Sequence, residues 1–197
     1  MPIRSAALTI DDCRELILLR TKAAKFFAVL LWLHVPVILV MAALNHIDWR
    51  PQALILVGIL IAPTIYALTR PASLATRMLI AIALTFMAMF FVFDNPGRLQ
   101  IDYHMYFFVV FAMLIAFCDW RPIVISAGLT SIHHLIFNVV DRARVFPTEG
   151  GIGHVALQTT MFAVECADSL QLNNDLLVAD EVRKILLCKH SPTVFQR

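Results

Sequence analysis

The sequence has few charged residues, which make up 15% of its 197 positions, against about 25% in typical soluble proteins. Neither sign dominates, since 16 Lys and Arg accompany 14 Asp and Glu and the formal net charge is +2. That small charge leaves no broad basic surface, which excludes a nucleic-acid-binding protein. The hydrophobic content of 60% and the mean hydropathy of +0.78 exclude a disordered chain and indicate one domain that lies in a bilayer.

Cysteine is also scarce, and the four cysteines lie far apart, at Cys13, Cys118, Cys166 and Cys188. This spacing excludes a disulfide-rich secreted module and the C-x-x-C type of metal site. The sequence lacks a Gly-rich phosphate-binding loop and the G-x-S-x-G and H-E-x-x-H motifs. We expect no cleavable signal peptide, because the first apolar run is too long for one. We therefore expect a protein that is not an enzyme, with redox chemistry as the activity left open.

Long apolar runs are abundant instead, and each is close to the length of about 17–25 residues that crosses a membrane as a helix. They predict an all-α, integral-membrane bundle of six transmembrane helices. The expected spans are 26–44, 53–68, 78–93, 101–118, 123–140 and 154–167. Gln158, Thr159, Thr160 and Glu165 interrupt the sixth span. The connectors are short and carry Pro and Gly, as breakers between spans should.

The distribution of Lys and Arg predicts the orientation of these spans. If the N-terminus is cytoplasmic, the outer segments hold only Arg50, Arg98, Arg142 and Arg144 of the 16 basic residues. An even number of spans places both termini on the same side, so both termini are then cytoplasmic. We therefore expect a multi-pass protein of the bacterial inner (cytoplasmic) membrane.

Two amphipathic segments flank the spans. Residues 9–25 predict a helix that leads into the first span, and residues 168–187 carry apolar positions near heptad spacing. The second pattern predicts a coiled-coil exit helix, and hence a homodimer, or else a helix on the membrane surface. The expected domains are a cytoplasmic amphipathic segment at 1–24, a transmembrane domain at 25–168, and an exit helix and tail at 169–197.

Histidines lie inside or beside the spans, where ionisable residues are costly and indicate function. Three consecutive spans bring His104, His133 or His134, and His154 to a similar depth near the outer side. Neighbours on a helix differ by about 100°, so His133 and His134 cannot both face one way, and both are candidate ligands. Imidazole binds Cu, Zn and Fe, and two opposed histidines can hold a b-type haem.

Asp102, Asn138 and Gln158 are candidates to orient the histidine rings of such a site. The alternative is that each histidine bonds a neighbouring backbone or hydroxyl group and only ties helices together. A second pair, His34 and Glu165, would meet near mid-membrane if the first and last spans are neighbours, and would respond to protons or to a ligand.

The segment DYHMYFFVVFAMLIAFCDWRPIVISAGLTSIHHLIFN at 102–138, followed by VFP at 145–147 and His154, resembles a bacterial receptor family. In that family a six-span sensor region precedes a methyl-accepting chemotaxis or diguanylate-cyclase output domain. The run LWLHVP at 31–36 and Glu165 are similar to family positions as well. The resemblance covers about residues 25–170, and no output domain follows it in this sequence.

The resemblance implies a sensory module in signal transduction or chemotaxis. A histidine-lined site in the outer half of the bundle would sense a ligand or redox state, and a cytoplasmic output partner would receive the signal. Two alternatives stay open. One is a membrane redox protein that binds haem or a metal, and the other is a proton or ion transporter that uses His34 and Glu165.

Overall fold

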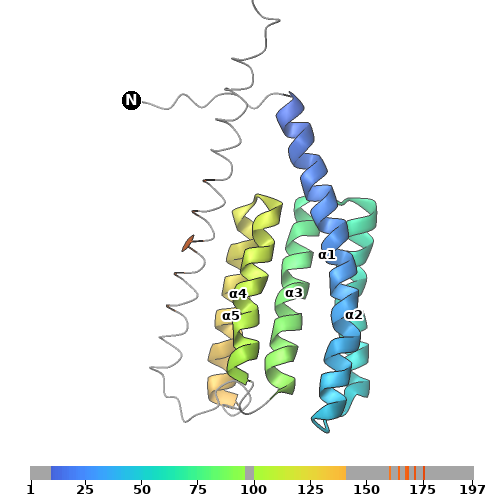
Figure 1. Cartoon of the computed structure of the whole chain (residues 1–197), viewed down its shortest axis with the longest axis vertical. Coiled ribbons are helices and arrows are strands. Elements are labelled where there is room, and N and C mark those ends of the chain that lie inside the picture. Colours follow the sequence, from blue (N-terminus) through green and yellow to red (C-terminus); the bar gives the residue numbers. More distant parts are fainter. Residues whose placement is uncertain are drawn as a thin grey trace, which may run out of the picture.

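The computed structural model describes residues 10–95 and 100–140, together with the isolated positions 160, 164, 167, 168, 171 and 175. This part of the chain is all-helical. The elements are α1 (Ile10–Leu44), α2 (Trp49–Thr69), α3 (Leu74–Asp94), α4 (Gln100–Leu114), the 3₁₀ turn η1 (Ile115–Phe117) and α5 (Trp120–Val140). Figure 1 shows the five α-helices running alternately up and down, side by side.

Four helices are long and apolar enough to cross a membrane, which indicates a membrane protein. They are Arg14–Leu44 of α1 and the whole of α2, α3 and α5. The predictions of apolar helices at the first, second, third and fifth spans are confirmed. The fourth is shorter than expected, because α4 ends at Leu114 and the chain continues as η1. The predicted span at 154–167, Glu165 and the exit helix lie outside the described residues or at isolated positions.

The helix boundaries follow from capping residues and prolines. Asp48 accepts a hydrogen bond from the Arg50 amide (3.1 Å) and starts α2, and Ser73 accepts one from the Thr76 amide (3.1 Å) and starts α3. Asp119 accepts one from the Arg121 amide (3.1 Å) at the start of α5. Before it, Cys118 has a φ of 46°, a left-handed conformation that closes η1.

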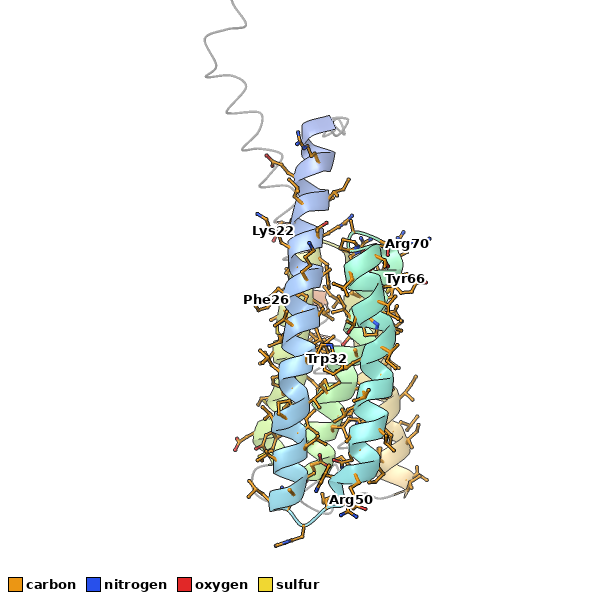
Figure 2. The ribbon with its side chains drawn as sticks, turned by 90° about the vertical axis from the view of Figure 1, so that its right-hand side faces the viewer. Lys22, Phe26, Trp32, Arg50, Tyr66 and Arg70 are labelled. Carbon is orange, nitrogen blue, oxygen red and sulfur yellow. The ribbon has the colours of Figure 1, made fainter. Side chains whose placement is uncertain are left out.

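α1 is continuous from the predicted amphipathic segment into the first span. Its 35 residues reach about 52 Å at 1.5 Å per residue, well beyond the 30 Å of a hydrocarbon core. The N-terminal part of α1 therefore projects past the other helices (Figures 1 and 2). Trp32 on the same helix donates a hydrogen bond to the Thr64 hydroxyl (3.0 Å) and so ties α1 to α2.

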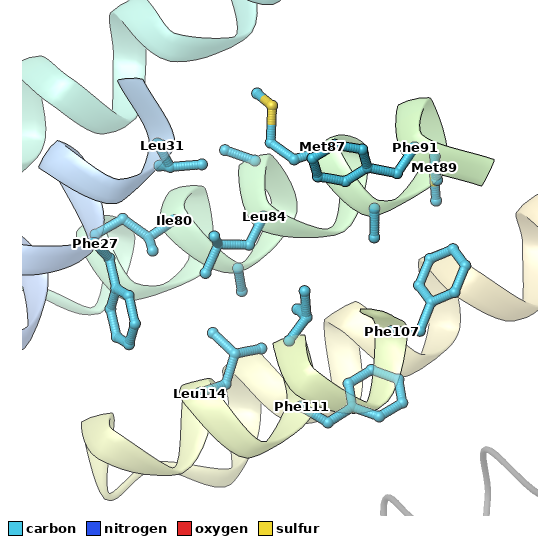
Figure 3. Packing of buried hydrophobic residues seen from close by; sticks show 14 of the residues in the cluster. Phe27, Leu31, Ile80, Leu84, Met87, Met89, Phe91, Phe107, Phe111 and Leu114 are labelled. Carbon is cyan, nitrogen blue, oxygen red and sulfur yellow. The ribbon is translucent and has the colours of Figure 1, made fainter. Parts of the chain in front are cut away.

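The core is built around α3, which packs against all four other α-helices. Its buried side chains meet those of α1 on one side and those of α4 on the other (Figure 3). By contrast, large apolar side chains such as Leu54, Leu68 and Val139 are more than 70% exposed on the outside. An exposed apolar surface of this extent is typical of a lipid-facing bundle.

The bundle has two chemically different ends. The N-terminal half of α1, the α2–α3 turn and the α4–α5 turn lie at one end (Figure 1), which we call the basic end. Of the described basic residues, it holds Arg14, Arg20, Lys22, Lys25, Arg70, Arg77 and Arg121, whereas Arg50 lies at the other. That other end holds His46, His104 and His134, and we call it the histidine end.

Candidate functional site

Three histidines from two helices form a buried group near the histidine end, here called the histidine cluster: His104 on α4, and His133 and His134 on α5. The ring centroids of His104 and His134 are 5.3 Å apart, and those of His133 and His134 are also 5.3 Å apart. All three side chains are buried, His134 with 1% exposure. The structure therefore brings His104 together with both candidate histidines of α5.

The backbone orients two of these rings. His104 Nδ1 lies 2.7 Å from the Gln100 carbonyl, and His134 Nδ1 lies 2.7 Å from the Thr130 carbonyl, each four residues earlier. A carbonyl oxygen only accepts hydrogen bonds, so each Nδ1 is the donor and carries the proton. Nε2 is then the atom of each ring through which a ligand would be bound.

His133 and His134 are both buried, although adjacent side chains on a helix point about 100° apart. Phe107 contacts both rings, with centroid distances of 6.2 and 5.4 Å. The physical reason is that α5 packs against both α3 and α4, which gives it a buried sector wide enough for two adjacent positions. His133 Nδ1 is buried without a hydrogen-bond partner among the described residues.

Aromatic side chains surround the histidine cluster. Phe107 also lies 6.3 Å from the His104 centroid, and Phe137 lies 4.7 Å from that of His133. A haem held by two histidines places its macrocycle between the rings. His104 and His134 are packed together with Phe107 against both, so the described residues do not fit a haem clamped between them.

A single metal ion needs less space between two histidine rings than a haem does. Two imidazoles that bind one ion at about 2.0–2.1 Å have centroids on the order of 5 Å apart, and ordinary ring packing gives a similar spacing. Within residues 10–95 and 100–140, no group of three or more His, Cys, Asp or Glu is arranged to hold a metal ion. The expected fourth histidine, His154, lies outside the described residues. His104 and His134 come from different helices and have a spacing that suits a shared ion.

Of the three residues expected to orient the histidine rings, the structure describes two. Asp102 is exposed on α4, so it does not support the buried rings, and the Gln100 carbonyl does so instead. Asn138 is buried, four residues after His134 on α5. Gln158 lies outside the described residues.

His34 lies elsewhere, in an aromatic group between α1, α3 and α4. Its Nδ1 lies 2.6 Å from the Leu30 carbonyl, and its Nε2 forms a hydrogen bond with the Tyr106 hydroxyl. Because Nδ1 is the donor, Nε2 accepts from Tyr106. Phe91 packs on both rings, at 5.8 and 5.3 Å. The expected partner Glu165 lies outside the described residues, and Tyr106 is a partner that the sequence analysis missed.

A second polar group lies at the histidine end. Gln52 donates a hydrogen bond to Asp94 Oδ1 (2.6 Å), and both side chains are buried. Asn45 bonds the Asp94 carbonyl (2.8 Å) and Asn95 Oδ1 (3.0 Å). These contacts join the ends of α1, α2 and α3. The signal available in the sequence was the position of four polar residues next to predicted span ends.

The basic end holds a buried ion pair between Arg77 of α3 and Asp119, at 2.9 Å. Arg20 of α1 reaches the same turn and donates to the carbonyls of Phe117 (3.0 Å) and Cys118 (2.9 Å). Two arginines from different helices therefore hold the α4–α5 turn. Asp119 caps the start of α5 through the Arg121 amide, and the two arginines add long-range contacts to this local one.

Comparison of the whole chain with protein-family models, curated proteins and solved structures found no match.

Proposed function

We propose that this chain is a membrane-embedded sensory module that detects a transition metal ion at the histidine cluster. The observation that carries the proposal is the burial of three imidazoles from two helices around Phe107. Buried polar rings cost free energy, and in a membrane protein they are a functional hypothesis by default. The resemblance of residues 102–138 to bacterial sensor regions supports the same function.

The proposed topology has six spans with both termini in the cytoplasm of a bacterium. The concentration of described basic residues at one end of the bundle supports it, because cytoplasmic segments are enriched in Lys and Arg. The histidine end then faces the outside, and a signal from the periplasm reaches the histidine cluster without crossing the bilayer.

The packing provides a way to transmit the signal. α4 and α5 carry the histidine cluster near one end and the turn held by Arg20 and Arg77 at the other. A ligand that changes how α4 and α5 meet would shift that turn and, through Arg20, α1. The proposed receiver of the signal is a cytoplasmic output partner that contacts the exit helix. The chain itself is proposed to form a homodimer. A ligand must bind one arrangement more tightly than the other to have any effect.

The experiment is a Zn²⁺ titration of the full chain in lipid nanodiscs, followed by calorimetry and by hydrogen exchange. We expect saturable binding that falls at least tenfold in His104→Ala and in His134→Ala, because each substitution removes a ligand of the pair. His46→Ala is the matched control, since His46 is exposed at the same end, and it should bind as the unaltered chain does.

A sensory role also requires that Zn²⁺ binding changes a part of the chain outside the histidine cluster. Zn²⁺ should also change hydrogen exchange in residues 160–187, and His104→Ala should abolish that change. Binding that is equal in all four proteins would refute the histidine site. Binding at the histidine cluster without any change beyond α4 and α5 would refute the sensory role.

A further inference from the structure

A groove lies between α1 and α4 close to the basic end. Its volume is about 430 Å³, within the range of about 300–1,000 Å³ that small-molecule sites occupy. The lining residues are Leu19, Lys22, Ala23, Phe26, Phe27, Ala112, Met113 and Ala116. All are apolar except Lys22, so the groove combines an apolar length with one positive charge.

The small side chains explain why the groove exists. Ala112 and Ala116 lie four residues apart along the chain, Ala112 within α4 and Ala116 in η1, and they leave space that larger residues would fill. On α1, Lys22 and Phe26 are likewise four residues apart, and Phe26 is 62% exposed. Figure 2 shows Lys22 and Phe26 on the same edge of α1, with Lys22 nearer the basic end. The charge therefore lies at the end of the groove nearer the membrane surface.

We propose that this groove binds one acyl chain of an anionic phospholipid, with the lipid phosphate on the Lys22 ammonium group. The chemistry of the groove matches an amphiphile with a long apolar part and a negative head. Arg20 cannot take the place of Lys22, because its guanidinium bonds the carbonyls of Phe117 and Cys118. The leaflet is the one at the basic end, where an anionic headgroup also meets the other basic residues.

The proposed lipid would bridge α1 and the segment from Ala112 to Ala116, next to the turn that Arg20 holds. It would therefore stabilise the packing of α1 against η1 at the end of α4. Lipid binding in this groove does not depend on the histidine cluster, which lies toward the opposite end of α4.

The test is native mass spectrometry of the full chain with phosphatidylglycerol or phosphatidylcholine of identical acyl chains. We expect phosphatidylglycerol to be retained preferentially. Lys22→Gln should reduce that preference about fivefold, the effect of one basic residue near an anionic surface. Lys25→Gln is the matched control, because Lys25 is exposed one turn nearer the bundle and does not line the groove, and it should change the preference less than twofold.

A second variant tests the apolar part. Ala112→Phe should fill the groove and lower retention of both lipids, whereas Ala62→Phe on the exposed surface of α2 should not. Equal retention of the two lipids by the unaltered chain, or equal effects of Lys22→Gln and Lys25→Gln, would overturn the proposal. So would a Met113→Cys variant that resists thiol labelling in lipid-free detergent, since another part of the chain or a second copy would then cover the groove.

Discussion

At the scale of single residues, three of the described histidines are oriented by the same backbone contact. His34, His104 and His134 each direct Nδ1 at the carbonyl four residues earlier on the same helix. That contact fixes the ring orientation and leaves Nε2 to act across the bundle. The Nε2 atom of His34 contacts the Tyr106 hydroxyl across the bundle. The Nε2 atoms of His104 and His134 are buried in the histidine cluster.

The Tyr106 hydroxyl provides the clearest prediction at this scale. Tyr106→Phe removes the donor to His34 and leaves a buried Nε2 without it, so we expect a loss of about 0.6–1.7 kcal/mol of unfolding free energy. Steric trapping in bicelles measures this free energy of unfolding. Tyr66→Phe is the control, because the hydrogen bonds that Tyr66 makes with Thr76 and Arg70 use its backbone carbonyl, which the substitution keeps. A Tyr106→Phe protein as stable as this control would show that the bond contributes nothing.

Residue positions were only partly predictable from the sequence. A rise of 1.5 Å per residue was enough to expect that His104 and His134 lie at one depth. It could not identify Tyr106 as the partner of His34, because that contact depends on how α1 and α4 are rotated about their axes. It could not show that His133 and His134 are both buried, because the width of the buried sector is set by the two neighbours of α5.

At the scale of elements, the α4–α5 turn is the most strongly held connection. Arg77 and Asp119 form an ion pair in which both side chains are 7% exposed. Arg77 also donates to the Ala72 carbonyl (2.7 Å), so its guanidinium joins two turns at the basic end. These contacts determine where α4 ends and where α5 begins.

Removing one partner of this ion pair leaves the other charge buried. Asp119→Asn or Arg77→Gln should therefore lower the unfolding free energy by about 3 kcal/mol. Arg121→Gln provides the comparison, because Arg121 is exposed and its substitution should cost less than about 1 kcal/mol. Thermal unfolding in detergent, followed by circular dichroism, gives the order of stabilities. If all three variants unfold at the same temperature, the ion pair does not hold the turn.

The elements themselves were predicted well where apolar runs are bounded by Pro, Asp or Ser. α2, α3 and α5 begin within four residues of the expected positions, because local capping chemistry determines those starts. α1 was expected as two parts and is one helix, since the amphipathic segment contains no breaker before the span. The end of α4 was missed, because η1 and the left-handed Cys118 depend on Arg20, which lies 98 residues away from Cys118.

At the scale of the whole molecule, the two ends of the bundle differ in charge. The proposed topology predicts that a cysteine at Arg50 is labelled by a membrane-impermeant maleimide in intact spheroplasts. A cysteine at Arg70 should be labelled only after permeabilisation, because the proposed topology places the basic end in the cytoplasm. Each is introduced with the four native cysteines replaced by serine. The reverse pattern would invert the topology, and the histidine cluster would then lie at the cytoplasmic side.

The proposed sensory function depends most on His104 and His134 lying against each other inside the helical bundle. Solid-state NMR of the histidine-labelled chain in bilayers measures this contact as a cross-peak between the two rings. With centroids 5.3 Å apart, we predict a cross-peak that disappears in His104→Asn, alongside the His133–His134 cross-peak that adjacent residues always give. A spectrum with only the His133–His134 cross-peak would contradict the histidine cluster and the function proposed from it.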